Sequence, residues 1–425
     1  MDILIRNIGE LVHVESSPKL QFSGKEMAEI GVLRDAFLFI ENGLIAEFGL
    51  MADLQDSGAI RKDAMYRFIE ADGKAVFPCF CDSHTHLVYP ESREQEFVDK
   101  IKGLSYEEIA KRGGGILNSA RRMKEKTEDE LFESAMLRLK EIIHLGTGAV
   151  EIKSGYGLDT KSELKMLRVI KRLKKESPLT IKSTFLGAHA IPTEFKKNQT
   201  DYVDLIINEM IPMVASEELA DYIDVFCDRG FFTVDDTDRI LNAGMKYGLR
   251  PKIHANELAN SGGIQVGVKY NALSVDHLEY TGDEEIEALK GTETMPTILP
   301  GAAFFLNMPL APARKMIDAG LPVAMASDFN PGSSPSGNMQ LILAMASILY
   351  KLTPEEGILA TTSNTAYAMD LSDQLGSIAV GKKANVFITK PIPGYRFMPY
   401  YYGHNKVETV ILNGVIQEKI PIVAT

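Results

Sequence analysis

The chain has 425 residues, with 46 Lys and Arg against 58 Asp and Glu, which gives a formal net charge of −12. This acidic balance argues against a nucleic-acid-binding protein, because such a protein needs basic residues to neutralise phosphates. A hydrophobic content of 45% with 24% charged residues excludes a disordered chain, and no run approaches the roughly 18 apolar residues of a membrane-spanning helix, so we expect a soluble globular protein.

The first 75 residues have the pattern of short strands and turns. β-rich runs lie at 2–8, 35–45 and 66–70, and the second contains the turn sequence Glu41-Asn42-Gly43. Few helical repeats occur in this part. We therefore expect residues 1–75 to belong to a small β domain.

From residue 76 onward, β-rich runs alternate with helical patterns, which is typical of parallel strands joined by crossover helices. Eight such runs lie at 76–82, 148–154, 180–186, 222–228, 250–256, 272–278, 293–299 and 322–328. Between them apolar residues recur every three or four positions, as at Leu131, Ala135 and Leu139. The pattern predicts an α/β fold, a (β/α)8 TIM-like barrel over residues 76–371, with its functional groups at the carboxyl ends of the strands.

After residue 371 the helical patterns stop, and glycine-punctuated β runs return at 376–389 and 407–416. This tail has the same character as the first 75 residues. We therefore expect residues 372–425 to pair with residues 1–75 in one composite β-sandwich domain formed by the N- and C-terminal segments.

Histidines gather at the ends of the predicted barrel strands. Five of the eight lie there: His84, His86, His189, His254 and His277. The other three, His13, His144 and His404, are expected to be structural or surface residues. Because His84 and His86 are two residues apart in an extended chain, they face the same way and could bind one metal ion, or could be ordinary hydrogen-bonded histidines.

A carboxylate completes a possible ligand set. Asp328 ends the eighth predicted strand, where it could bind a metal or act as a turn or helix-capping residue. Three imidazoles and one carboxylate suit zinc or iron and leave room for a water molecule. Such an open position is typical of a catalytic metal.

Longer motifs point to a known family. The run Phe77-Pro78-Cys79-Phe80-Cys81-Asp82-Ser83-His84-Thr85-His86, followed by His254, His277 and Asp328, resembles the amidohydrolase superfamily. The segments 110–117, 151–157, 185–190 and 328–335 are most similar to its imidazolonepropionase family, over nearly the whole chain. Cys79 and Asn385 depart from the glycine and aspartate that are usual there. Neither is a ligand candidate, and Cys79 and Cys81 should face away from the metal.

The resemblance implies a role for each site residue. Metal ligands, for one zinc or iron ion, would be His84, His86, His254 and Asp328. Catalytic residues would be Glu257, His277 and Asp328. Substrate-binding residues would be Arg93, Tyr156, His189, Glu257, Asn330, Gly332 and Ser333. Taken alone, Arg93 would more often be a solvated surface arginine, and Tyr156 and His189 would more often be packing or hydrogen-bonding residues.

The activity implied by the resemblance is hydrolysis of the cyclic C–N amide bond of 4-imidazolone-5-propanoate to N-formimidoyl-L-glutamate. A metal ion lowers the pKa of bound water towards ~7. Asp328 could then accept the proton of the attacking water, and His277 could stabilise the oxygen of the intermediate. Glu257 would carry a proton to the departing ring nitrogen, while Arg93 would bind the propionate.

Two other functions stay open. An aminohydrolase acting on a nucleobase-like ring uses an equivalent ligand set, and a non-catalytic relative could use the barrel as a scaffold. The resemblance also suggests a homodimer. The N-terminal sequence lacks the pattern of a secretory signal, and three cysteines in a long chain do not form a disulfide framework, so we expect a cytoplasmic protein with reduced thiols.

Overall fold

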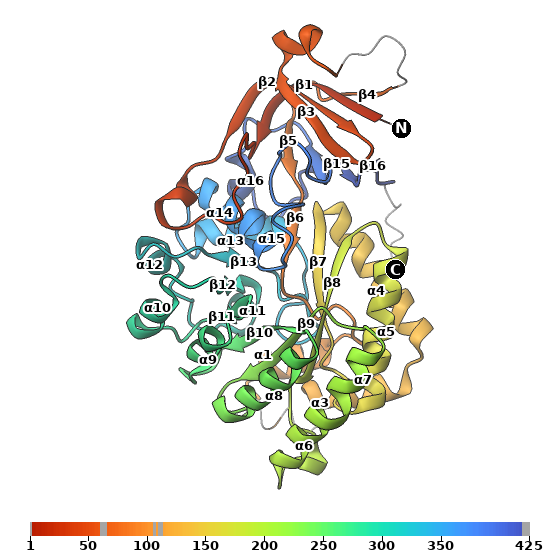
Figure 1. Ribbon diagram of the computed structural model, residues 1–425, viewed down its shortest axis with the longest axis vertical. Helices are drawn as coiled ribbons and strands as arrows, with labels where there is room; N and C mark the ends of the chain where they lie inside the picture. Colours follow the sequence, from red (N-terminus) through yellow and green to blue (C-terminus); the bar gives the residue numbers. More distant parts are fainter. Residues whose placement is uncertain (1, 60–65, 105–107, 109–113, 419–425) are drawn as a thin grey trace.

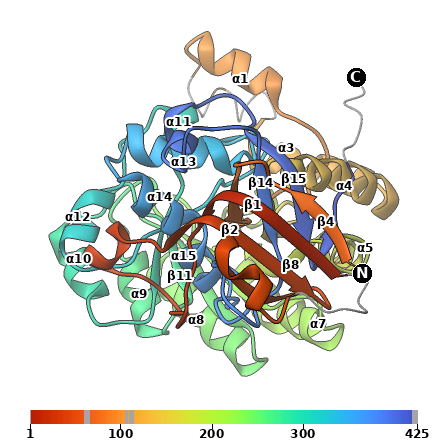
Figure 2. The same ribbon diagram turned by 90° about the horizontal axis from the view of Figure 1, so that it is seen from above.

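The computed structural model describes residues 2–59, 66–104, 108 and 114–418. Within these residues the chain forms two sheets of eight strands each, one from the middle of the chain and one from both ends. Figure 1 shows the terminal sheet at one end of the molecule and the barrel with its helices at the other. In the view turned by 90°, strands β1 and β2 cross over the barrel (Figure 2).

The barrel sheet is parallel and has the order β13-β12-β11-β10-β9-β8-β7-β6. The strands are β6 (Phe80–Asp82), β7 (Thr147–Lys153), β8 (Thr180–Ala188), β9 (Tyr222–Cys227), β10 (Arg250–Ala255), β11 (Ser274–His277), β12 (Met295–Ile298) and β13 (Ala324–Met325). Just beyond β13 the chain pairs with the segment after β6 through the bridge Thr85–Phe329. The amide of His86 donates to the carbonyl of Phe329 at 2.9 Å, and that of Asp328 to the carbonyl of His84 at 3.0 Å. The predicted TIM-like barrel is confirmed.

Helices follow the barrel strands and pack around them (Figure 1). They are α1 (Glu94–Ile101), α3 (Ile116–Glu125), α4 (Glu128–His144), α5 (Thr160–Glu176), α6 (Gln199–Leu205), α7 (Ile211–Ser216), α8 (Val234–Lys246), α9 (Gly263–Lys269), α10 (Asp283–Leu289), α11 (Pro300–Leu306), α12 (Ala313–Asp318), α13 (Met339–Ile348), α14 (Pro354–Thr361) and α15 (Ser363–Tyr367). None of the helices in the described part of the chain has both the length and the apolar character needed to cross a membrane.

Helix α4 illustrates why these segments are helical. It begins at a capping box in which Thr127 and Glu130 satisfy each other's free amides. Its predicted apolar positions, Leu131, Ala135 and Leu139, are all buried. The helix is therefore fixed by a local start signal and by burial of one face.

The terminal sheet joins the two ends of the chain. Its strands are β1 (Asp2–Val12), β2 (Val32–Glu41), β3 (Leu44–Leu50), β4 (Tyr66–Glu70), β5 (Ala75–Pro78), β14 (Val386–Thr389), β15 (Val407–Leu412) and β16 (Val415–Ile416). The order is β16-β15-β14-β5-β1-β2-β3, with β4 also paired to β1. Asn42 and Gly43 adopt positive φ angles of 52° and 81° in the predicted turn between β2 and β3. The expected sheet domain from both termini is confirmed, and it is one connected hydrogen-bonded network.

Two predicted elements differ in the structure. The expected first barrel strand, 76–82, is two strands, because its pairing partner changes at Cys79: the Cys79 amide donates to Asn385 of the terminal region, and the Phe80 amide donates to Gly146 before β7. The tail also contains a short helix, α16 (Phe397–Tyr400), where none was expected. One helical turn is too short to produce a recognisable apolar repeat.

Four short segments complete the described elements: the 3-10 helices η1 (Gly24–Ala28), η2 (Met51–Asp56) and η3 (Thr193–Phe195), and the π-helical turn η4 (Ile206–Met210).

The three cysteines are free and buried. Cys81 packs with Ala149 and Met369 in an apolar cluster, and burial raises the pKa of its thiol to about 12. This side chain therefore behaves as a small apolar residue.

Candidate metal centre and active site

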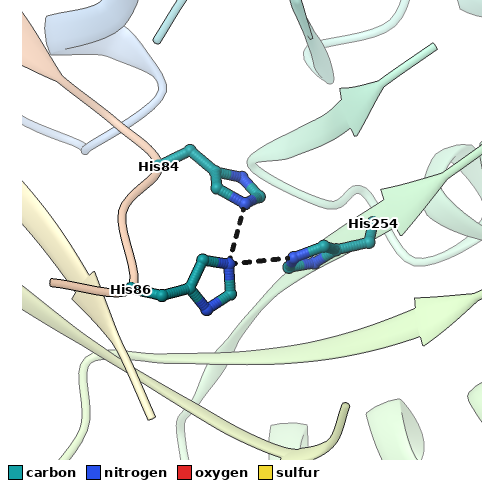
Figure 3. A group of neighbouring side chains, drawn as sticks. All are labelled: His84, His86 and His254. Atoms are coloured by element: carbon teal, nitrogen blue, oxygen red, sulfur yellow. Dashed lines mark hydrogen bonds between the residues drawn. The ribbon is translucent and has the colours of Figure 1, made fainter. Parts of the chain in front are cut away.

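Three imidazoles converge at the carboxyl end of the barrel (Figure 3). His84 and His86 follow β6, and His254 lies in β10. Nε2 of His86 is 3.3 Å from Nε2 of His84 and 3.4 Å from Nε2 of His254. All three side chains are buried. The short distances between their Nε2 atoms show that the extended chain after β6 presents both of its histidines to one point.

The donor set fits a metal ion. Two ligand atoms bonded to zinc at tetrahedral angles would lie about 3.3 Å apart, given Zn–N bonds of about 2.0–2.1 Å. Oδ1 of Asp328 is 3.6 Å from Nε2 of both His84 and His86, a position from which it could provide a fourth donor. Burial holds the pKa of His84 and His86 well below the usual 6.5. These imidazoles are therefore neutral, the form that binds metals.

Two aspartates lie beside the outer ring nitrogens of His84 and His254. Oδ2 of Asp276 in β11 lies 2.6 Å from Nδ1 of His84. Oδ2 of Asp224 in β9 lies 2.9 Å from Nδ1 of His254. A carboxylate at Nδ1 fixes the proton there and leaves the Nε2 lone pair free for a metal. The sequence interpretation assigned no role to either aspartate.

A buried charge network joins these aspartates below the metal centre. Nζ of Lys153 lies 2.8 Å from Asp224, 3.8 Å from Asp276 and 2.6 Å from Glu151. Lys252 contacts the other oxygen of Glu151 and lies 4.0 Å from Asp276. Burial lowers the pKa of Lys153, but the surrounding carboxylates outweigh burial and raise it overall. A signal for this network was present in the sequence, because Glu151 and Lys153 are charged residues at alternate positions of one buried strand.

Two candidate acid–base residues lie beside the centre. Nε2 of His277, at the end of β11, is 3.5 Å from Oε2 of Glu257, in the loop after β10. Burial, with the nearby carboxyls of Asp328 and Asp228, raises the pKa of Glu257 to about 8. Burial also raises the pKa of Asp328 to about 7. Both carboxyls can therefore gain or lose a proton near neutral pH.

An aromatic wall borders the imidazole cluster. The ring of His189, after β8, stacks on His86 with centroids 5.0 Å apart. Tyr156, after β7, lies 5.4 Å from His189 and 5.9 Å from His86, measured between ring centroids. Nδ1 of His189 is 2.9 Å from the carbonyl oxygen of Gly155, which sets the orientation of the ring. These two predicted substrate contacts therefore do face the metal centre.

The loop after β13 is held together by its own side chains. The amide group of Asn330 donates to the carbonyl of Asp328 and to the hydroxyl of Ser333, and its oxygen accepts from the amides of Gly332 and Ser333. Ser333 also donates to the Asp328 carboxylate at 3.3 Å. Asn330 thus organises the loop that carries the metal-ligand candidate Asp328.

Arg93 lies against this loop and is mostly buried. A Cβ atom added at Gly332 would lie 2.3 Å from Nη1 of Arg93, so only glycine leaves room for the guanidinium. The carboxylate of Glu96 accepts from Nε of Arg93 at 2.8 Å and from the amide of Gly115 at 2.9 Å. Arg93 is therefore held in place and is not the solvated surface residue of the alternative interpretation.

A further carboxylate was also missed. Glu163, at the start of α5, accepts hydrogen bonds from the amides of Gly155, Gly157 and Leu158. It thereby fixes the loop that carries Tyr156. Residues 110–113 of the motif 110–117 lie outside the described residues.

Comparison with known proteins places the chain in a family. A model of the amidohydrolase family matches residues 113–416. The imidazolonepropionase of Flavobacterium johnsoniae is 56% identical over 98% of this chain and 100% of the relative. That of Christiangramia forsetii is 55% identical over 97% of this chain and 99% of the relative.

Solved structures with much lower identity share the fold. E. coli guanine deaminase has a TM-score of 0.75 at 14% identity and covers 99% of this chain and 100% of its own. A zinc-bound adenosine deaminase from Xanthomonas campestris has a TM-score of 0.68 at 16% identity and covers 98% of this chain and 92% of its own. At such identities the likeness concerns the fold alone. The family model and the full-length relatives together show that the chain belongs to the imidazolonepropionase family of the amidohydrolases.

Proposed function

We propose that this protein hydrolyses the cyclic C–N amide bond of 4-imidazolone-5-propanoate to N-formimidoyl-L-glutamate, in histidine degradation. The observation that carries the proposal is the convergence of three imidazoles and Asp328 in a chain that is 56% identical, over nearly its full length, to an imidazolonepropionase.

His84, His86, His254 and Asp328 would hold one zinc or iron ion in this proposal. The bound ion would supply Lewis-acid chemistry that makes water a nucleophile at neutral pH. The support is the ligand spacing and the two aspartates that leave Nε2 free on His84 and His254. The same carboxylates keep those imidazoles in one tautomer and one orientation.

Proton movements are assigned to three side chains of this chain. Asp328, with a pKa of about 7, would accept the proton of the attacking water. Glu257, with a pKa of about 8, is largely protonated at neutral pH and would donate to the departing ring nitrogen. His277 would donate from Nε2 to the oxygen of the tetrahedral intermediate, an interaction worth roughly 3–4 kcal/mol.

Substrate binding in an acidic protein requires a local cation for the propionate. Arg93 would supply two parallel N–H donors from a position fixed by Glu96 and Gly332. Tyr156 and His189 would hold the ring against the metal centre, and Asn330, Gly332 and Ser333 would line the loop beside it. The homodimer and the cytoplasmic location stay predictions, and light scattering of the purified protein tests the former.

The direct test is to incubate the purified, metal-assayed protein with 4-imidazolone-5-propanoate and follow loss of the ring absorbance. A panel of nucleobases with an ammonia assay runs in parallel. The proposal predicts ring opening without ammonia release. Ammonia from a nucleobase, with no reaction of the imidazolone, would favour the aminohydrolase alternative.

A further inference from the structure

A second buried carboxyl group lies beside His277, at its other ring nitrogen. Oε2 of Glu279 is 3.9 Å from Nδ1 of His277, whereas Oε2 of Glu257 is 3.5 Å from Nε2. The imidazole thus lies between two glutamates. Glu257 is already assigned to proton transfer, but Glu279 has no role in the proposed mechanism.

Glu279 and the facing ring nitrogen lack other partners. Within the described part of the chain, neither carboxyl oxygen of Glu279 has a hydrogen-bond partner, and neither has Nδ1 of His277. Both residues are buried, with relative exposures of 5% and 2%. A buried polar group left without a partner destabilises the fold, so the persistence of this pair next to the candidate active site indicates a function for it.

The backbone between these residues is strained in a way that brings them together. His277 and Leu278 have φ angles of 87° and 74°, in the region that non-glycine residues rarely adopt. The turn is held against the end of β10, because the amide of Leu278 donates to Ala255 and that of Tyr280 donates to Asn256. Strain of this kind is typical of functional sites, where the fold maintains it for a specific placement of side chains.

We propose that Glu279 is a positioning residue that holds Nδ1 of His277 and so directs an Nε2–H donor to the reacting oxygen. The inference rests on the proposed function of His277. Protonated Glu279 donates its O–H to Nδ1, and the ring proton is then on Nε2. The 3.9 Å gap is about 1 Å longer than a hydrogen bond, and such contacts often tighten only when substrate binds.

The surroundings of Glu279 favour its neutral form. Burial raises its pKa well above the usual range, and the nearby carboxyls of Glu257, Asp328 and Asp228 act in the same direction. The phenol of Tyr350, also buried, is a further titratable group nearby. A carboxylic acid kept neutral in an apolar site is a competent hydrogen-bond donor.

The kinetic test compares Glu279→Gln with Glu279→Leu in the full-length, metal-loaded protein. The glutamine amide can still donate to Nδ1, so kcat should stay within about fivefold of wild type. The leucine variant cannot donate, so kcat should fall about 100-fold, as for the loss of one oxyanion donor, with KM and metal content unchanged. Glu285→Gln, a buried glutamate that caps α10, is the matched control.

Three results would overturn the inference: equal kcat for the leucine variant and wild type, an equal loss in both Glu279 variants, or loss of metal from the leucine variant. A substrate-independent readout is ¹⁵N NMR of histidine-labelled, zinc-loaded protein, with His277 assigned by His277→Gln. The Nε2–H tautomer is expected in wild type and in Glu279→Gln, and an Nδ1–H tautomer in wild type contradicts the inference. If wild type fails to open the imidazolone ring, the proposed function fails, and the NMR result still decides the role of Glu279.

Discussion

The barrel and the terminal sheet have the same number of strands but different interiors. The terminal sheet encloses aliphatic residues such as Ile5, Leu38 and Ile388. The carboxyl end of the barrel encloses imidazoles and, below them, a network that includes Lys153 and Asp224. Buried charges add less stability than well-packed apolar side chains. The charged interior of the barrel is therefore better explained by orienting the candidate metal ligands than by stabilising the fold. The apolar interior of the terminal sheet serves stability alone.

Buried histidines show the same contrast. Nδ1 of His254 in the barrel faces Asp224 at 2.9 Å. His13, just after β1, faces the hydroxyls of Thr362 and Ser363 at 3.4 Å and 3.3 Å, and its Nε2 is 3.9 Å from Oε2 of Glu15. A carboxylate beside an imidazole fixes a metal-binding tautomer, whereas hydroxyl groups only satisfy a polar ring. A carboxylate at 2.6–2.9 Å from Nδ1 thus distinguishes His84 and His254 from His13.

The largest effect is expected from removing a candidate ligand histidine, because this changes both metal binding and turnover. His254→Ala should lose its bound metal and about 10⁴-fold or more of its turnover, because only two imidazoles and the carboxylate of Asp328 remain to bind the ion. Elemental analysis and the ring-opening assay measure both. His404→Ala, at an exposed site, is the matched control and should keep its metal. Full metal content in His254→Ala would contradict the ligand assignment.

Removal of one buried charge comes next. Lys153→Met should lower the free energy of unfolding by about 3–5 kcal/mol, because it removes the ammonium partner of Asp224 and leaves Glu151 with Lys252 alone in the barrel interior. Denaturant unfolding measures the change. Lys175→Met, on the exposed face of α5, should stay within about 0.5 kcal/mol of wild type. If both variants are equally stable, the network contributes no electrostatic stability.

A cavity in the terminal sheet should destabilise the protein without changing its chemistry. Leu38→Ala removes a fully buried side chain and should cost about 2–5 kcal/mol of unfolding free energy. Below its unfolding temperature the variant should keep wild-type kcat and metal content. Loss of metal from this variant would show that the two regions are not independent.

The smallest effect is expected from replacing His13, which should change only the pH dependence of stability. Burial, with a contribution from Lys382, lowers the pKa of His13 to about 3 in the folded protein. Below the ordinary value of 6.5 the unfolded chain binds a proton that the folded chain excludes, so stability is lost as pH falls from 6.5 towards 3. Between pH 7.5 and 5 this amounts to about 2 kcal/mol. Unfolding of His13→Asn should lack this component, and equal pH dependence in both proteins would contradict the assignment.

The sequence alone determined the fold class and the candidate metal ligands. Periodic apolar runs are local signals, and eight of them in alternation with helical patterns are compatible with few folds other than a barrel. The histidines at the strand ends and the family motifs likewise depend only on residues near one another in the chain. These features could be predicted because strand ends gather at one face of any such barrel.

The tertiary structure alone decided which groups support that site. Thr85 pairs with Phe329 only because the last strand closes on the first. Asp276 reaches His84 across 192 residues of sequence, and Lys153 bridges strands that are not consecutive. The sequence marks such residues as buried and charged, but their partners depend on strand register and on the closure of the barrel. The turn that brings Glu279 to His277 depends on backbone angles that no residue type there predicts.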